Sequence, residues 1–589
     1  MKCYAKSLAA MAFALCLAGC GDTTASKDGD GKTTSAGGDT SYFYGARIIP
    51  GDGSPALEDQ SFIVTNGKIT KIGPRKEVEP PKGSNRVELT GRTVTPAFIN
   101  LAAQPGMNNG NQYGPKNYTR ASVTADLSRY AYYGVVGVLT SGTDSGNLAS
   151  SVSDEIRDGK IKGARLLTAG RGLAPKGGGP AGLGDVPYQI GSAADAKRAV
   201  GELATDKAAA IKLWMDDGNG KGPHLKADAY EAAIEEAHKR NLKIVAEVTD
   251  LSDAKDLVKA GIDGFVSSIR DKEVDDALVG SMKEKNVFLA PALTFAESKF
   301  VYADKPNWLG EQTMREVYPA QLMGYLLDPV SINIYKRLPN LGELRQQYAT
   351  ATKNLKKLSA GGVKIALGTN SGAAATYPGY FELREMILMA DAGMAPMDVI
   401  KAATSVPASI LGLNDLGTIA VGKTGTFLSM PNNPLEKMSD IKDIGMLYLN
   451  GSEQERSALV QDIKINTEVL HITKEQRQAD AAAEAQAAKD AADAKLPHYG
   501  KFPLGPSQRV RGLAIPVPKD SRADAKAGPP DKVTVSMRAS AADLRGFYAA
   551  ALTAYKWNAA GNCWEYNSPS RRLCLDASAN SAVITITDK

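Results

Sequence analysis

Residues 227–268 read ADAYEAAIEEAHKRNLKIVAEVTDLSDAKDLVKAGIDGFVSS and decide the fold class. A helix with one polar face is predicted from Ala227 to Arg240, and the apolar, β-branched run 242–248 follows it. The next helix, 253–259, stops at Gly261 and leads into a second short run at 264–268. Helices that glycine closes and that lead into buried strands are typical of parallel βα units. The stretch therefore predicts an α/β fold.

The same order of helix and strand recurs between residues 96 and 413. Parallel strands need long crossovers, and this number of repeats in this length suits a closed barrel. We therefore predict a distorted (β/α)8 TIM-like barrel over residues 96–413. Its expected strands include 133–139, 208–214, 242–248, 264–268, 286–291 and 362–368.

Short alternating runs over residues 42–95 predict β-strands, and Asn66-Gly67 between two of them is a strong hairpin signal. After the barrel, the segment 453–530 is expected to hold an Ala-rich helix and a linker. The Ala-rich part, 474–495, reads as a solvated helix, with a coiled coil as the alternative, and the Pro/Gly-rich part, 496–530, reads as a linker. The last segment, 531–589, predicts a small β-α-β-β-β module, for which a stabilised binding module is the default interpretation.

The first residues indicate export. Lys2 and Lys6 flank an apolar run that is too short to span a bilayer. The run ends in Leu-Ala-Gly-Cys20, which resembles a bacterial lipobox, and in that family of signals the Cys is lipidated after cleavage. We expect a signal peptide over 1–20, a flexible linker over 21–41, and a lipid anchor facing the periplasm. Because Gly21 and not Asp follows Cys20, the outer membrane is favoured; an ordinary secretory signal is the alternative.

Composition and cysteine usage agree with an exported globular protein. The chain has 589 residues, 43% hydrophobic and 23% charged, which is enough for several domains. A net charge of +5 without basic blocks argues against nucleic-acid binding. Of the five cysteines, only Cys563 and Cys574 lie beyond the signal, and an oxidising compartment predicts a disulfide between them.

Residues 95–104, TPAFINLAAQ, resemble the first-strand signature of the amidohydrolase superfamily, Pro-Gly-Leu-Ile-Asp-x-His-x-His. The resemblance covers about residues 42–449 and is closest to the imidazolonepropionase and prolidase-like branch. It implies that 42–95 and 414–452 together form a composite β-sandwich beside the barrel. Further matches lie outside the active site, at 51–53, 66–69, 72–74, 393–396, 402–404 and 411–423.

The resemblance implies a divalent metal such as zinc, but nearly every expected ligand differs here. The two first-strand His positions fall on Ala102 and Gln104, and the two later His positions on Glu247 and Ser267. The lysine, often carboxylated in the family, is present as Lys212, and the catalytic Asp falls on Asn370. Alanine offers no ligand and neutral amides are weak ones, so we expect no metal cofactor. Asn370 also cannot take a proton from water, so we expect no standard hydrolytic cycle.

Lys212 and Glu247 should project from neighbouring strands, so we predict an ion pair between them in place of the metal. Its favoured role is to fill a vacated polar cavity; the alternative is an acid/base pair or a ligand anchor. Lys212, Glu247 and Asn370 are thus the candidate catalytic positions. Candidate ligand-binding residues are Gln104, Ser267, His224 in a loop near the barrel mouth, and Tyr377 and Tyr380, which are as compatible with packing.

Two functions follow as expectations. The first is a metal-free, ligand-binding or scaffolding pseudoenzyme in the cell envelope. The second is a hydrolase of carbon–nitrogen, non-peptide bonds in a small amide, acting through a divergent site. A third, activity in the C-terminal module, has no sequence feature behind it. Expected partners are the membrane, through the lipid anchor, and a small-molecule ligand. The resemblance also allows a homodimer, because amidohydrolases often pair through their barrels.

Overall fold

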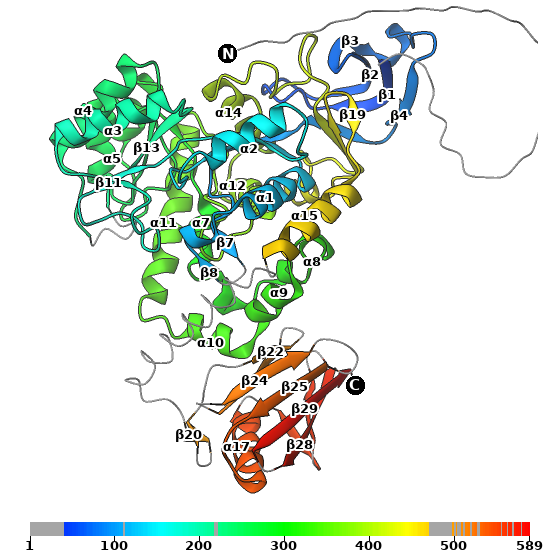
Figure 1. Cartoon of the computed structure of the whole chain (residues 1–589). Helices are drawn as coiled ribbons and strands as arrows, with labels where there is room; N and C mark the ends of the chain where they lie inside the picture. Colours follow the sequence, from blue (N-terminus) through cyan, green and yellow to red (C-terminus); the bar gives the residue numbers. More distant parts are fainter. Residues whose placement is uncertain are drawn as a thin grey trace, which may run out of the picture.

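The computed structural model describes residues 40–109, 112–216, 222–470 and several shorter stretches between 498 and 588. The predicted signal peptide with Cys20, most of the 21–41 linker, and the predicted helix over 474–495 lie outside the described residues. Within the described part, no helix combines the length and apolarity needed to cross a bilayer. The barrel occupies the centre of the molecule, with the N-terminal sheet on one side and the C-terminal module beyond α9 (Ala320–Leu327) and α10 (Pro329–Lys336) (Figure 1).

A closed (β/α)8 barrel forms the core, which confirms the predicted fold class. Two parallel sheets supply seven of its strands. The eighth is the segment 365–371, which bridges Leu289 on one side and Ala103 on the other. The Ala209 amide donates to the Thr168 carbonyl at 2.7 Å and joins the two sheets. The strands are β6 (Phe98–Ala103), β9 (Val135–Thr140), β10 (Arg165–Leu167), β13 (Ala210–Trp214), β14 (Lys243–Glu247), β15 (Gly264–Phe265) and β16 (Phe288–Leu289).

Helices surround the barrel and bury one face each against it. In α4 (Ala227–Lys239) the buried side chains include Ala233, Ile234 and Ala237, which lie on one face of the helix. The next helix, α5 (Leu251–Ala260), is capped by Gly261, whose φ of +97° is a left-handed conformation that glycine adopts without strain. The other barrel helices are α1 (Arg120–Tyr132), α2 (Leu148–Arg157), α3 (Ala193–Thr205), α6 (Asp276–Glu284), α11 (Leu341–Ala360), α12 (Tyr380–Asp391), α13 (Pro396–Ala403) and α14 (Ser405–Ile410).

Between β16 and α11 the chain forms a helical insertion. It includes α7 (Leu293–Ser298), α8 (Gln312–Val317), α9 and α10, with short 3-10 turns at Val301–Asp304 and Asn307–Gly310. Two further short strands, β11 (Leu173–Pro175) and β12 (Tyr188–Ile190), extend the sheet beside β13.

Strands from before and after the barrel share one eight-stranded sheet. Its two halves face each other around aromatic side chains: the rings of Phe43 and Phe427, far apart in sequence, have centroids 5.1 Å apart. Asn66 and Gly67 form the predicted hairpin turn, both with positive φ. The strands are β1 (Thr40–Ile48), β2 (Leu57–Thr65), β3 (Lys68–Pro74), β4 (Asn85–Glu88), β5 (Thr93–Pro96), β17 (Phe427–Met430), β18 (Met446–Leu449) and β19 (Ser452–Glu453).

The linker predicted over residues 496–530 was wrong in its described parts, which contain paired strands. The helix α15 (Arg456–Leu470) packs on α1, and it buries Leu459 and Ile463 in the barrel core. These side chains lie four residues apart, so they share one face of the helix. Further along, β24 (Arg522–Lys526) pairs with the first predicted strand of the module. Short hairpins pair β20 (His498–Tyr499) with β21 (Phe502–Pro503), and β22 (Gln508–Val510) with β23 (Leu513–Ile515).

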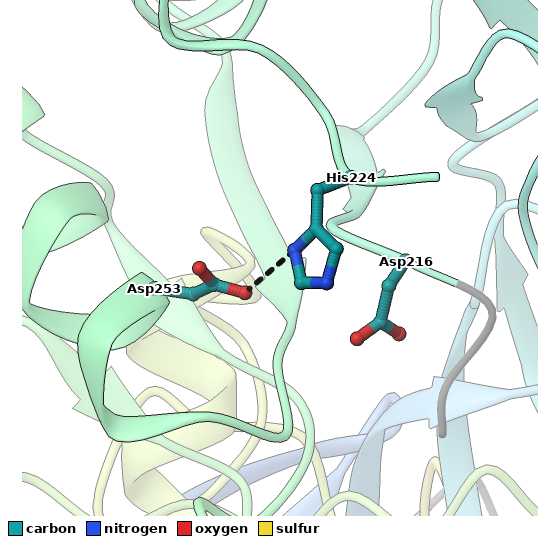
Figure 2. A group of neighbouring side chains, drawn as sticks. All are labelled: Asp216, His224 and Asp253. Carbon is teal, nitrogen blue, oxygen red and sulfur yellow. Dashed lines mark ion pairs between the residues drawn. The ribbon is translucent and has the colours of Figure 1, made fainter. Parts of the chain in front are cut away.

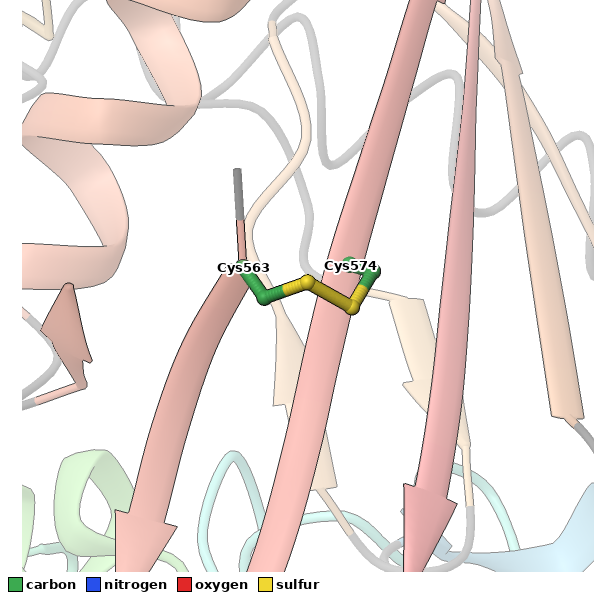
Figure 3. Close-up of a disulfide and its surroundings, with 2 residues drawn as sticks. All are labelled: Cys563 and Cys574. Carbon is green, nitrogen blue, oxygen red and sulfur yellow. A yellow bond between two sulfur atoms is a disulfide. The ribbon is translucent and has the colours of Figure 1, made fainter. Parts of the chain in front are cut away.

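The C-terminal module is a six-stranded sheet with one helix, α17 (Ala541–Ala554), whose buried face carries Leu544, Phe547 and Leu552. The predicted disulfide is confirmed: Cys563 and Cys574 are direct partners on neighbouring antiparallel strands, with Cα atoms 4.1 Å apart (Figure 3). The sheet order is β24, β25 (Asp531–Ser536), β29 (Ser581–Asp588), β28 (Ser570–Ser578), β27 (Cys563–Asn567) and β26 (Asn558–Ala560).

Candidate active site at the barrel centre

Lys212 and Glu247 meet at the carboxyl ends of β13 and β14. The two strands are parallel neighbours, so polar side chains at their ends point into the same space. The Lys212 Nζ donates to Glu247 Oε2 at 3.0 Å, which confirms the predicted ion pair. Lys212 is 1% exposed and Glu247 8%, so the pair is withdrawn from water.

A hydrogen-bonded chain extends from this pair across the barrel. Lys212 Nζ also donates to Ser141 Oγ at 2.8 Å, and Ser141 Oγ donates to Asn370 Oδ1 at 2.8 Å. On the other side, Trp214 Nε1 donates to Glu247 Oε2 at 3.2 Å. The Lys212 ammonium lies 4.9 Å from the centroid of the Trp214 ring, within cation–π range. Ser141 and Trp214 are thus part of the site, although the sequence analysis missed both.

Positive charges hold the carboxyl group of Glu247 ionised. Burial alone would raise its pKa, but the positive charges of Lys212, Arg270 and Lys299 outweigh burial and lower it. Burial lowers the pKa of Lys212, and the Glu247 carboxylate opposes this effect. Burial and the charge of Arg270 lower the pKa of Lys299 to about 8. The one carboxylate at the family's ligand positions is therefore already neutralised by cations of the protein.

The other family positions are likewise occupied by contacts within the protein. The Gln104 Oε1 accepts a hydrogen bond of 2.6 Å from the hydroxyl of Tyr113, on the hairpin of β7 (Asn108–Asn109) and β8 (Gln112–Tyr113). Ser267 Oγ donates to the Val248 carbonyl at 2.7 Å and accepts from the Val248 amide at 2.8 Å. Ala102 is buried and has no polar side-chain atom.

This donor set does not fit the family's metal. A zinc centre needs several imidazole, thiolate or carboxylate ligands at about 2.0–2.3 Å. Glu247 is the single such group among the family positions, and a metal bound to it would have to displace the Lys212 ammonium. The hydroxyl of Ser267 and the amide of Asn370 are neutral and engaged in hydrogen bonds. What the arrangement offers is a buried ion pair beside a serine hydroxyl.

The two tyrosines proposed to contact a ligand are enclosed by other aromatic side chains. Tyr377 packs against Tyr318, with ring centroids 5.2 Å apart, and Tyr380 against Trp308 at 5.4 Å. Both tyrosines are 2% exposed. The structure favours the packing alternative that the sequence also allowed, and contact with a ligand would require a rearrangement of these rings.

His224 lies at the rim of the barrel mouth, away from the buried pair. Its imidazole faces Asp253, with Nδ1 and Oδ2 3.4 Å apart, and Asp216 lies beside it (Figure 2). Asp216 follows β13 by two residues, and Asp253 lies in the first turn of α5 after β14. The sequence analysis missed both aspartates, although acidic residues directly after two neighbouring strands are a signal that could have located them.

Comparisons with known proteins agree with this architecture. A sequence model described as "Amidohydrolase family" matches residues 218–453, a range that includes Glu247, Ser267 and Asn370. Over these residues the chain is similar to the amidohydrolase family. The match starts after Lys212 and the first barrel strand, where the two most evident ligand replacements occur. A search of curated proteins finds no match.

Solved amidohydrolase-like structures resemble the fold at low sequence identity. An Xaa-Pro dipeptidase with bound methionine aligns with a TM-score of 0.57 at 20% identity, covering 71% of this chain and 100% of that chain. Molinate hydrolase aligns with a TM-score of 0.56 at 16% identity, covering 72% and 96%. The A. niger ochratoxinase aligns with a TM-score of 0.55 at 18% identity, covering 70% and 95%. At these identities the likeness supports the shared fold.

Proposed function

We propose that this protein is an amidohydrolase-like ligand-binding or scaffolding protein that does not perform the metal-dependent hydrolysis of its superfamily. The observation that carries the proposal is the buried Lys212–Glu247 pair at the positions where the family holds its metal. A hydrolytic metal must be charge-compensated by its ligands and must lower the pKa of a bound water. Here the carboxylate is compensated by lysine, and Asn370 stands where a general base would be needed.

The test is a hydrolysis assay with substrates of the aligned enzymes. The chain from Gly21 onward is assayed with an Xaa-Pro dipeptide, molinate and ochratoxin, with and without added zinc or manganese. We expect rates equal to the buffer blank under every condition, with the aligned ochratoxinase as the positive control for its substrate. Metal-dependent turnover that Glu247→Gln abolishes would overturn the proposal. A thermal-shift screen of small amides and carboxylates then addresses ligand binding.

The contact between Lys212 and Ser141 favours a second candidate, a metal-free hydrolase. Ser–Lys pairs are a known variant of nucleophilic catalysis. In such a reaction Ser141 Oγ attacks the carbonyl carbon of an amide, and its proton passes to a neutral Lys212. The lysine returns the proton to the leaving amine, and water then cleaves the ester. Glu247 opposes this route because it stabilises the charged form of Lys212.

The same assay separates the two candidates. Hydrolysis through Ser141 would resist chelators and would be lost in Ser141→Ala, whereas a ligand-binding barrel shows no turnover in either protein. The substrate class under this candidate is a small molecule with a carbon–nitrogen bond outside a peptide chain. This class rests on analogy with the superfamily.

The proposal places the barrel in the bacterial cell envelope. The lipobox ending at Cys20 supports a lipid anchor, and the disulfide between Cys563 and Cys574 is compatible with an oxidising compartment. The partners in this proposal are the membrane, a small-molecule ligand and, as an assembly open to test, a second copy of the chain. Even charge along the sequence supports the exclusion of nucleic acid.

A further inference from the structure

Three metal-ligating side chains meet at the rim of the barrel, outside the positions at which the superfamily binds metal. Asp216 follows β13, His224 lies in the loop ahead of α4, and Asp253 lies in the first turn of α5. The carboxyl ends of parallel neighbouring strands bring these loops to one edge. Figure 2 shows the imidazole of His224 between the two carboxylates.

The geometry of the cluster is compatible with one shared cation. One ligand atom from each residue lies within 4.8 Å of the other two. His224 Nδ1 and Asp253 Oδ2 are 3.4 Å apart. Donors about 2.0–2.1 Å from a tetrahedral metal lie roughly 3.3 Å from one another, so modest side-chain rotation would complete the contacts. One imidazole and two carboxylates are a donor set typical of zinc and similar borderline cations, whereas calcium and magnesium prefer oxygen alone.

The surroundings of the cluster are acidic. Asp216 is 4% exposed, and the side chain of Asp253 is 17% exposed. Burial raises the pKa of Asp253, and His224 opposes this effect. The carboxylates of Asp216, Asp250 and Asp256 raise the pKa further. The positive charge of Arg270 offsets part of this negative charge, because Arg270 interacts electrostatically with Asp216 and Asp250. Arg270 also interacts with Glu247 at the barrel centre.

In charge and in solvent access, the rim cluster therefore differs from the buried Lys212–Glu247 pair. The rim has an excess of carboxylates, one histidine, and access to solvent through the His224 side chain, which is 41% exposed. We propose that Asp216, His224 and Asp253 bind one divalent transition-metal cation, with zinc as the preferred ion. The exposed side of the site leaves coordination positions open to water or to an anionic group of a ligand. The proposal goes beyond the function proposed above and does not depend on it.

The test is calorimetric titration of the tag-free chain, after chelator treatment, with zinc alone, and then with manganese and calcium. We expect one equivalent of zinc per chain, bound more tightly than either other ion. His224→Ala and Asp253→Asn should each weaken zinc binding at least tenfold. Asp253→Asn keeps the shape of the side chain, so a loss of affinity without a change in melting temperature reports on the ligand and not on folding.

A matched control tests whether any His–Asp pair at the surface would bind zinc. His238 lies 3.0 Å from Asp263, a pair of the same chemistry that has no third ligand among the described residues. His238→Ala should leave zinc binding unchanged. Cobalt substitution gives a second readout, because the visible absorption of a tetrahedral site should disappear in His224→Ala. The proposal is overturned if zinc does not bind stoichiometrically, or if it binds equally to wild type, His224→Ala and Asp253→Asn.

Failure of this site and failure of the proposed function are distinguishable. Metal-dependent hydrolysis that is lost in Glu247→Gln contradicts the proposed function and leaves the rim site intact. Zinc binding that survives both rim substitutions contradicts the rim site and leaves the proposed function intact. The two results depend on different residues and different measurements.

Discussion

At the scale of single residues, Lys212 shows how a carboxylate can be buried at the centre of a barrel. A cavity lined by one carboxylate and no compensating cation would carry a large desolvation penalty. The Lys212 ammonium supplies the compensating charge, and Ser141 and Trp214 satisfy the remaining hydrogen bonds. The pair is therefore best understood as the means by which this buried polar space stays occupied.

Removal of one partner should be costly. In Lys212→Met the carboxylate of Glu247 stays buried without its main partner, and we expect a loss of about 3–5 kcal/mol in the free energy of unfolding. The double variant Lys212→Met/Glu247→Leu should be more stable than the single variant, because no buried charge remains. Urea denaturation of the barrel transition measures both.

A surface lysine of the neighbouring strand provides the control. Lys243 pairs with Asp263, and its side chain is 55% exposed. Lys243→Met should cost less than about 1 kcal/mol, as exposed pairs contribute little. Equal losses in Lys212→Met and Lys243→Met would contradict the assigned role of the buried pair.

A second buried carboxyl should make stability depend on pH. Glu382 on α12 is fully buried and accepts hydrogen bonds from Asn100, Thr369 and Ser371, but burial dominates and raises its pKa to about 7. A raised folded-state pKa means that the folded protein binds the proton more tightly than the unfolded chain does. The stabilisation is therefore full below about pH 4.5 and is lost as pH rises through about 7, up to roughly 3 kcal/mol.

The measurement is the free energy of unfolding between pH 4.5 and 8. Wild type should lose stability over this range, and Glu382→Gln, which cannot titrate, should show a smaller slope whatever its absolute stability. Identical slopes in the two proteins would rule out Glu382 as the titrating group. The comparison of slopes removes the contribution of the other groups that titrate in this range.

At the scale of elements, local signals in the sequence were sufficient wherever a helix closed at glycine and a buried strand followed. The run 242–248 became β14, and Gly261 ended α5 in the expected left-handed conformation. The contact between Lys212 and Glu247 could be predicted because their two strands were expected to be parallel neighbours. Ser141 was missed because it comes from β9, two barrel strands before β13, and nothing local indicates that its side chain reaches Lys212.

The misread segments share a physical cause, which is a weak local pattern stabilised by distant contacts. The strand β24 reads RADAK, a polar sequence whose strand character depends on pairing with β25. The helix α15 was not predicted as part of the barrel, although Leu459 and Ile463 are buried against it. Tertiary packing decided both elements, and one sequence cannot show which surface lies opposite.

The packing of α15 on the barrel can be tested by truncation of one side chain. Leu459 is 2% exposed, so Leu459→Ala should lower the free energy of unfolding of the barrel by about 2–4 kcal/mol through lost burial and a residual cavity. Gln461 is exposed on the same helix, and Gln461→Ala should change stability by less than about 0.5 kcal/mol. A neutral Leu459→Ala would show that α15 is not part of the barrel's cooperative unit.

At the scale of the whole molecule, the folded parts and the proposed anchor should act independently. The described sheet, barrel and module begin at Thr40, about twenty residues after Cys20, and that interval is composed of Gly, Ser, Thr, Asp, Lys and two Ala. The proposed anchor is thus separated in sequence from the folded parts, which would let the barrel reach solutes without contacting the bilayer. Membrane attachment should then depend on acyl chains, at about 0.8 kcal/mol per buried CH₂ group, and not on the folded surface.

This argument predicts what happens when the anchor is removed. Replacement of residues 1–20 by an ordinary cleavable secretory signal leaves a mature chain that starts at Gly21. We expect it in the soluble periplasmic fraction with an unchanged melting temperature, whereas the native chain should sediment with membranes and require detergent for release. Mass spectrometry of the native N-terminal peptide should show an acylated Cys20. A Gly21 chain that still sediments with membranes would mean that the folded surface itself binds the membrane, because no acylated residue remains to hold it there.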